Sequence, residues 1–326
     1  MKNVLFITEQ GARIGRSGHS LEVYKNGERI FLFPLEQLSQ LIIMGRVEIS
    51  TATMALLMAR GVDTVFLTLD GRYKGRLCGK TSKNIVIREL QFQKRLDARF
   101  ALAVSKEIVR AKLKNTSHFL RVSHHALWEE LRPRIRNALK SIQACDQMEQ
   151  LRGIEGSFAH FYFQHFPRLL RHPMNFKGRK KHPPPDPINI LLSLGYTLLF
   201  NTLYGLVEAA GLDPYAGFYH QSSYGHPALV SDLVEPFRAP VIDRMVVALV
   251  NNEVVTRQDF QKEGEQWRIG EEALKTVVQK YQQRLSATRK IGDRQVRVLT
   301  LLQNTVWKFQ KYLKGEVQSF QPFLFR

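Results

Sequence analysis

The hydrophobic period of the sequence changes near residue 84, and this change limits the chain to a fold with two unlike parts. Before it, short apolar and β-branched runs such as VLFITE, SLEVYK and ERIFLF are separated by Gly, Asn-Gly or Pro. Asn26-Gly27 between two of these runs is a strong β-hairpin signal, because both residues tolerate the positive φ angles of a tight turn. Residues 1–83 are therefore expected to form a small β-rich domain, with one short helix after Ser50.

From residue 84 onward, apolar residues recur at helical spacing to the end of the chain. We expect a larger all-α domain over 84–326, which makes the fold class α+β. The expected helices lie near 84–114, 116–130, 134–166, 187–211, 227–252, 270–288 and 293–314. Between two of them, the segment 168–187 contains several prolines, which predict an irregular loop.

Charge indicates the class of partner. The 326 residues include 48 Lys and Arg but only 29 Asp and Glu, a formal net charge of +19. Such an excess favours a polyanion, and nucleic acid is the commonest one. A basic surface kept only for solubility is the alternative. Basic residues between 94 and 121 have helical spacing and predict a helix face that contacts phosphates: Lys94, Arg95, Arg99, Lys106, Arg110, Lys112, Lys114 and Arg121.

Several classes are disfavoured. Hydrophobic residues make up 44% of the chain, which is too many for wholesale disorder. No stretch approaches the ~18 uninterrupted apolar residues of a membrane span, and Glu9 interrupts the N-terminal apolar run too soon for a signal peptide. Cys78 and Cys145 are too few for a disulfide scaffold or a cysteine-based zinc site. We therefore expect a cytoplasmic protein without a membrane partner.

Carboxylates and one histidine stand out against this basic background. Glu155 is bracketed by Gly153 and Gly156, which leave room beside it for a ligand or a second backbone, although a kinked helix with a solvated Glu has the same pattern. His220 follows a helix stop and a turn, among aromatic residues, where a structural histidine is also common.

Asp232 and Glu235 are three residues apart and so share a helical face. Taken alone, such a pair is usually solvated. Together with Glu155 and His220 it supplies carboxylate oxygens and one imidazole, a set that suits a hard divalent cation. Phosphodiester chemistry needs such an ion to neutralise the charge that develops on phosphorus.

The sequence resembles the CRISPR adaptation integrases, the family of the first CRISPR-associated protein. The resemblance runs nearly end to end. It rests on FPLEQLSQLIIMGRVEISTATMALLMARGVDTVFLTLDGRYKGRL in the first part, and on RGIEG, DPINILLSLGYTLL, GLDPYAGFYH and LVSDLVEPFRAPVIDR in the second. The order and spacing of the last four motifs are highly specific.

The resemblance implies a β-rich dimerisation domain, a catalytic α-helical domain, a homodimer and a partnership with the small second adaptation protein. It implies that Glu155, His220 and Glu235 bind Mg²⁺ or Mn²⁺ and that Asp232 is a further catalytic residue. Many members have Asp where Glu235 stands. The implied reaction is attack of the 3′-hydroxyl of double-stranded DNA on a phosphodiester at the border of the CRISPR repeat next to the leader, with associated endonuclease activity.

Softer roles fall to residues around this set. Arg238 is expected to clamp phosphate or to pair with a ligand carboxylate, and Tyr196 either faces the catalytic centre or packs. In the loop, Lys177, Arg179, Lys180 and Lys181 are expected to contact DNA, with Phe176 stacking on bases. Two rival hypotheses remain: a transposon-type integrase or branched-DNA nuclease of the same fold, and a non-catalytic DNA-binding subunit whose carboxylates are structural.

Overall fold

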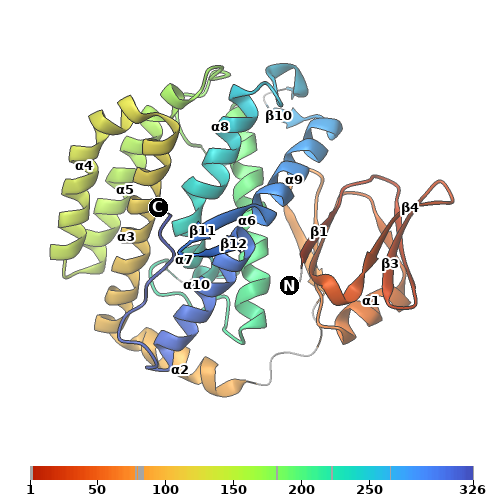
Figure 1. The fold of residues 1–326 in the computed structure, drawn as a ribbon, viewed down its shortest axis with the longest axis horizontal. Coiled ribbons are helices and arrows are strands. Elements are labelled where there is room, and N and C mark those ends of the chain that lie inside the picture. Colours follow the sequence, from red (N-terminus) through yellow and green to blue (C-terminus); the bar gives the residue numbers. More distant parts are fainter. Residues whose placement is uncertain are drawn as a thin grey trace. The chain divides into compact units, whose positions relative to one another are not determined.

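The structure, a computed structural model, describes residues 3–77, 79, 84–180, 183–221, 223–264 and 266–325. Contacts divide the chain into two compact units, residues 1–82 and 83–326. The first is rich in strands and the second is mostly helical (Figure 1), so the expected α+β fold class is confirmed.

The first unit contains two four-stranded sheets. One has the order β1-β5-β7-β8, in which the first three strands are parallel and the last is antiparallel. The other has the order β4-β3-β2-β6, with β3 antiparallel to both neighbours and β6 parallel to β2. The strands are β1 (Asn3–Ile7), β2 (Arg13–Ser17), β3 (Ser20–Lys25), β4 (Glu28–Pro34), β5 (Leu38–Met44), β6 (Glu48–Ile49), β7 (Asp63–Leu67) and β8 (Tyr73–Leu77).

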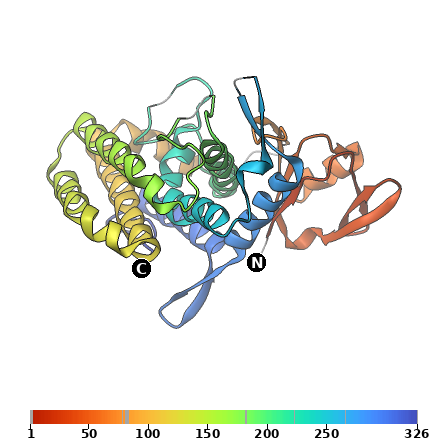
Figure 2. The same ribbon diagram turned by 90° about the horizontal axis from the view of Figure 1, so that it is seen from above.

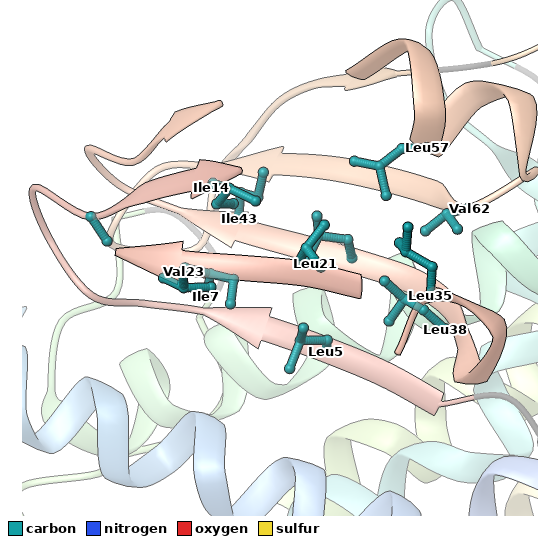
Figure 3. Close-up of a cluster of buried hydrophobic side chains, with 12 residues drawn as sticks. Leu5, Ile7, Ile14, Leu21, Val23, Leu35, Leu38, Ile43, Leu57 and Val62 are labelled. Carbon is teal, nitrogen blue, oxygen red and sulfur yellow. The ribbon is translucent and has the colours of Figure 1, made fainter. Parts of the chain in front are cut away.

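The two sheets and helix α1 (Thr51–Ala59) share one hydrophobic core. Leu5 and Ile43 from one sheet lie in the same cluster as Ile14 and Leu21 from the other, and Leu57 of α1 joins them (Figure 3). Burying side chains of this size from both sheets stabilises the unit by about 1.5 to 3 kcal/mol each.

Local signals explain the turns of this unit. Asn26 and Gly27 have φ angles of 52° and 85° between β3 and β4, which confirms the predicted hairpin. The Oγ of Ser50 accepts a hydrogen bond from the amide of Thr53 (3.2 Å) and begins α1, also as predicted.

The second unit is built from nine helices in its described part, with two short hairpins between them. The helices are α2 (Ile85–Leu96), α3 (Ala98–Ser123), α4 (His125–Ala144), α5 (Met148–His165), α6 (Pro187–Ala209), α7 (Ala228–Val234), α8 (Arg244–Asn251), α9 (Glu271–Ser286) and α10 (Val298–Leu313). The hairpins pair β9 (Phe260–Glu263) with β10 (Gln266–Ile269), and β11 (Thr288–Ile291) with β12 (Arg294–Arg297). Hydrophobic periodicity did not indicate these strands.

Helix boundaries differ from the prediction in several places, and the single helix expected over 134–166 is divided between α4 and α5. Asp97 accepts hydrogen bonds from the amides of Arg99 and Phe100 and so splits the expected first helix into α2 and α3. His124 separates α3 from α4, because its Nδ1 accepts the amide of Leu127 (3.1 Å) as an unusual N-cap. Pro133, where a new helix was expected, lies inside α4 instead.

Helix α6 is the long apolar helix of this unit. Asp186 caps its first turn by accepting the amide of Asn189 (2.8 Å), and Pro187 follows at the first helical position. By length and composition α6 is the one described helix that could cross a membrane, yet 61% of its most apolar window is buried inside the protein. It is therefore packed as a core helix.

Glycine allows α6 to approach the segment after α7 closely. A Cβ on Gly195 would lie 2.5 Å from Cγ2 of Ile242, closer than real Cβ contacts. Ile242 belongs to a π-helical segment (η4, Arg238–Asp243) that follows a 3₁₀ turn (η3, Glu235–Phe237). π-Helical turns are rare and often occur at functional sites.

The C-terminal tail packs on its own unit. Asn115 of α3 donates hydrogen bonds from its amide nitrogen to the carbonyl oxygens of Pro236 (2.8 Å) and Phe323 (2.9 Å), and its Oδ1 accepts the amide of Phe325 (2.9 Å). Phe320 and Phe325 are buried. One side chain thus ties the tail to the residue after Glu235.

Candidate active site

The loop that ends in His220 is held by one buried carboxylate. Asp232 on α7 is fully buried and accepts hydrogen bonds from the backbone amides of Phe218 (2.6 Å), Tyr219 (3.0 Å) and His220 (2.8 Å). The loop reaches α7 because residue 217 is glycine: a Cβ there would lie 2.6 Å from the backbone carbon of Ala228. Asp232 therefore fixes the loop on the start of α7.

The same carboxylate orients the His220 ring. Oδ1 of Asp232 lies 2.7 Å from Nδ1 of His220. Because a carboxylate only accepts, the proton belongs on Nδ1 and the lone pair lies on Nε2. A histidine held in this way by a carboxylate is typical of metal ligands and general bases. Asp232, predicted as catalytic, thus lies behind His220 with its oxygens occupied, and we assign it as a positioning residue.

Glu155 of α5 and Glu235 of η3 lie on either side of the Lys112 ammonium group. Nζ of Lys112 on α3 contacts Oε1 of Glu155 and lies 2.6 Å from Oε2 of Glu235. The Lys112 and Glu235 side chains are 15% and 4% exposed. Three helical segments, far apart in sequence, thus bring two carboxylates around one positive charge.

The two glycines next to Glu155 leave its outer side open. A Cβ on Gly153 or on Gly156 would meet no described atom within 4 Å, so no second backbone packs there. Of the two roles expected for these glycines, close backbone packing is wrong for the described residues, and space beside Glu155 is observed. The hydroxyl of Tyr219 reaches Glu155 Oε2 at 3.5 Å, at the limit of a hydrogen bond.

Burial and neighbouring charges act in opposite directions on the pKa values of Glu235 and Lys112. Burial alone would raise the pKa of Glu235, but the positive charges of Arg238 and Lys112 outweigh burial and lower this pKa to about 2. Burial would lower the pKa of Lys112, but Glu235 and Glu155 raise it. Both groups are therefore ionised at neutral pH.

The residues fit a divalent cation by chemistry rather than by a preformed geometry. Among the described residues, no three His, Cys, Asp or Glu side chains are already arranged to hold a metal ion. Instead, the Lys112 ammonium group lies between the two carboxylates, and Oε2 of Glu235 is buried with no hydrogen-bond partner besides this ion pair. Two carboxylates that already enclose a cation, with an imidazole close enough for its charge to act on Glu235, are a donor set that suits Mg²⁺ or Mn²⁺.

Arg238 and Tyr196 form a second layer around Glu235. Nη2 of Arg238 lies 3.1 Å from Oε1 of Glu235, and its guanidinium group stacks over the Tyr196 ring at 5.0 Å. The Tyr196 hydroxyl donates to Asp243 (2.6 Å), which also accepts from Tyr162 (2.8 Å). Of the roles expected for Arg238, pairing with a carboxylate, that of Glu235, is observed. Tyr196 packs beneath Arg238.

The 168–187 loop contributes fewer free charges than predicted. Lys177 and Lys180 are exposed. Arg179 instead donates to Asn189 (2.9 Å) and Ser193 (3.0 Å) of α6 and stacks over Tyr196 at 5.4 Å. Lys181 lies outside the described residues.

Phe176 of this loop is 5% exposed and packs against Phe166, with ring centroids 5.5 Å apart. The expected base stacking by Phe176 is therefore wrong for this structure, because the ring belongs to the core.

Lys112 is the residue of the candidate site that sequence reasoning misassigned. It was grouped with the basic face of a helix, yet its side chain is buried among carboxylates. A signal was present: Lys112 follows Ile108 by four residues and precedes Phe119 by seven, so it lies on the apolar stripe of α3. Tyr219 was also missed, although it lies inside the GFYH motif.

The family model of the CRISPR associated protein Cas1 matches residues 5–283. The chain belongs to the Cas1 family. It is 33% identical to the CRISPR-associated endonuclease Cas1 3 of Thermus thermophilus over 337 aligned positions, which cover 99% of this chain and 97% of that protein. The expected family and enzyme class, an endonuclease, are thereby confirmed.

Solved structures share the fold. A chain of a Cas6-RT-Cas1–Cas2 complex aligns with a TM-score of 0.85 at 24% identity, over 99% of this chain. A casposase bound to an integration product aligns with a TM-score of 0.83 at 19% identity, over 98% of this chain and 92% of that one. This chain spans only 36% of the first of these proteins. At these identities the likeness shows the Cas1 fold alone.

Proposed function

We propose that this Cas1 family member is a metal-dependent DNA integrase that joins prespacer 3′-hydroxyl ends into a CRISPR repeat array and also cuts DNA. The observation that carries the proposal is the pair of carboxylates, Glu155 and Glu235, that encloses a cation beside a histidine oriented by Asp232. The net charge of +19 supports a nucleic-acid partner.

Glu155, Glu235 and Nε2 of His220 would hold Mg²⁺ or Mn²⁺. When bound, the ion would neutralise charge that develops on the attacked phosphodiester. The protein's own groups position this set. Asp232 keeps Nε2 of His220 free, and Arg238 holds one oxygen of Glu235 while leaving the other for a cation.

Lys112 would have two roles in this proposal. Without metal, its ammonium group pairs with both carboxylates. With a divalent cation held by the carboxylates, the displaced charge of Lys112 would be available beside them to a phosphate oxygen of the DNA. The reaction itself exchanges one phosphodiester for another, so it needs no external energy source.

Basic residues of the loop after α5, and residues next to Glu235, would contact the DNA. Lys177 and Lys180 are exposed on the loop after α5 and would contact backbone phosphates, and the same role is proposed for Lys181. Arg179, Arg238 and Tyr196 would support the DNA end from below the carboxylates.

The first unit would form a homodimer, because its edge strand β4 exposes Ile30, Phe31 and Leu32. The similar complex that contains Cas2 supports a partnership with the small second adaptation protein in the cytoplasm.

The proposal is tested by incubating a short duplex with a supercoiled plasmid that carries a leader and repeats, together with the second adaptation protein and Mg²⁺ or Mn²⁺. Wild type should give repeat-border products, and Glu155→Gln, His220→Asn and Glu235→Gln should not. Glu149→Gln is the matched control, because Glu149 is an exposed carboxylate of the same helix α5. Folded site variants that still join DNA would show that the carboxylates are structural.

The preferred DNA target distinguishes the proposed function from that of the rival transposon-type integrase. The casposase neighbour makes a transposon-type integrase the alternative with structural support, although that support extends only to the fold. A preference for transposon ends over repeat borders would favour it.

A further inference from the structure

Three arginines meet at the base of the β11–β12 hairpin. Arg244 is the first residue of α8, Arg284 lies in the last turn of α9, and Arg289 lies in β11. Nη2 of Arg284 donates to the carbonyl oxygen of Pro240, which precedes Arg244 by about one helical turn. Only a short link separates α9 from β11, so the three guanidinium groups come from one small region.

These guanidinium groups lack counter-ions among the described residues. Nε of Arg284 and Nε of Arg289 are buried without a hydrogen-bond partner. The guanidinium group of Arg244 makes no hydrogen bond or ion pair with any described side chain. The neighbouring carboxylate, Asp243, is taken up by Tyr162 and Tyr196. Partly buried cations without counter-ions are costly, so a site that keeps three of them together suits an anion.

Electrostatics agree with this geometry. Burial, with the charges of Arg244 and Arg289, lowers the pKa of Arg284 to about 10. Burial and Arg289 likewise lower the pKa of Arg244. The pKa of His118 on α3 is lowered by burial and by Arg121, Arg244 and Arg289. Among the residues that the structure describes, no carboxylate offsets these shifts, and a pKa of about 10 still leaves the Arg284 guanidinium group charged at neutral pH.

The hairpin above this cluster is itself basic and accessible. Figure 2 shows it, in blue, projecting away from the helices of its unit. Lys290 and Arg294 are exposed on it, with Asp293 as its one acidic residue. A projecting two-stranded ribbon with exposed cations is a shape that proteins use to contact the DNA backbone and grooves.

We propose that Arg244, Arg284 and Arg289 bind a backbone phosphate of DNA, and that Lys290 and Arg294 contact neighbouring phosphates. The site shares no residue with the carboxylate cluster and would hold a second stretch of DNA. A phosphate offers more acceptor oxygens to three guanidinium groups than a carboxylate does. The inference rests on DNA being the partner in the proposed function, but not on catalysis.

The first test measures anion binding by thermal unfolding in EDTA, with inorganic phosphate as the probe. Arg244→Gln/Arg289→Gln is compared with Arg132→Gln/Arg268→Gln, whose guanidinium groups are exposed and paired with carboxylates. The site variant should unfold at a higher temperature than wild type in phosphate-free buffer, because repulsion is removed. It should also lose most of the stabilisation by phosphate that wild type and the control retain. A lower unfolding temperature without phosphate would show a structural role and overturn the inference.

The second test measures binding of a duplex in EDTA between about 50 and 200 mM salt. Each neutralised phosphate contributes about 1 to the slope of log affinity against log salt, so the site variant, which loses two of the three guanidinium groups on one phosphate, should lose up to about 1 and bind roughly tenfold more weakly at low salt. An unchanged slope would overturn the inference, even if phosphate stabilises wild type, since the site would then take a free anion only. Wild type that binds DNA through these arginines but joins no ends would refute the proposed function and leave this inference standing.

Discussion

Replacing Lys112 with methionine removes the positive charge between Glu155 and Glu235 at nearly constant side-chain length. In wild type the ammonium group contacts both carboxylates and is largely buried. Leaving buried carboxylates uncompensated costs about 3 to 5 kcal/mol. For a unit of this size, 1 kcal/mol shifts the unfolding temperature by about 2 to 4 °C, so we expect Lys112→Met to unfold about 10 °C lower in EDTA.

Binding of a divalent metal ion should restore the stability that Lys112→Met loses. In wild type a cation must displace the ammonium group, whereas in Lys112→Met no ammonium group has to be displaced and only Arg238 still pairs with Glu235. If the ammonium group contributes about 3 kcal/mol to the metal-free state, its removal raises metal affinity by up to about a hundredfold. The metal-dependent rise in unfolding temperature should therefore be larger in the variant than in wild type.

The assay is thermal unfolding in EDTA and across a titration with Mn²⁺, with calorimetry for the affinity. Lys140→Met is the control, because it makes the same change at an exposed position of α4. An unchanged unfolding temperature in EDTA, together with a metal-dependent rise no larger than that of wild type, would refute the reasoning about the carboxylate pair.

Three further changes test neighbouring parts of the site. Asp232→Asn removes an acceptor for backbone amides and for the His220 ring. Unfolding by urea should therefore show a free energy of unfolding lower by about 2 to 4 kcal/mol, and Mn²⁺ should stabilise the variant less than wild type. Full metal-dependent stabilisation would contradict the positioning role of Asp232. Asn115→Ala should make the C-terminal tail sensitive to limited proteolysis. A tail as resistant as that of wild type would contradict the role of Asn115 in holding it. Burial raises the pKa of Asp243 despite hydrogen bonds from two tyrosine hydroxyls, so its contribution to stability is present at low pH and is lost as pH rises through the folded pKa. The unfolding temperature of Asp243→Asn, relative to wild type, should therefore be higher at about pH 7 than at about pH 4, and a difference independent of pH would be the opposing result.

Local chemistry made much of this predictable from sequence. The Asn26-Gly27 turn and the Ser50 cap depend only on neighbouring residues, so the first unit followed from its own signals. The residue types of Glu155, His220 and Glu235, together with the resemblance to the adaptation integrases, marked them as a set, and the structure places the two carboxylates on either side of one cation.

Tertiary packing decided the rest. Lys112 looks like any basic helix residue until α3, α5 and η3 are packed together. Phe176 lies in a basic loop whose composition suggests nucleic-acid binding, but its ring packs against Phe166 in the core. The imidazole cap at His124 has no common sequence signature, which is why the break between α3 and α4 was misplaced.

Repulsion between cations is equally hard to read from sequence. The arginines at the base of the β11–β12 hairpin come from segments up to 45 positions apart, from Arg244 to Arg289, and their lack of counter-ions is a property of the folded state.

The central claim is that a DNA 3′-hydroxyl is joined to a repeat border at the Glu155–Glu235 site. The most direct measurement compares two otherwise identical labelled duplexes, one ending in 3′-hydroxyl and one in 3′-dideoxy nucleotides, incubated with a repeat-bearing plasmid, the second adaptation protein and Mn²⁺. We predict that label from the 3′-hydroxyl duplex alone enters the plasmid at repeat borders, and that Glu235→Gln abolishes its entry. Equal entry of both duplexes, or joining by folded Glu235→Gln, would contradict the account.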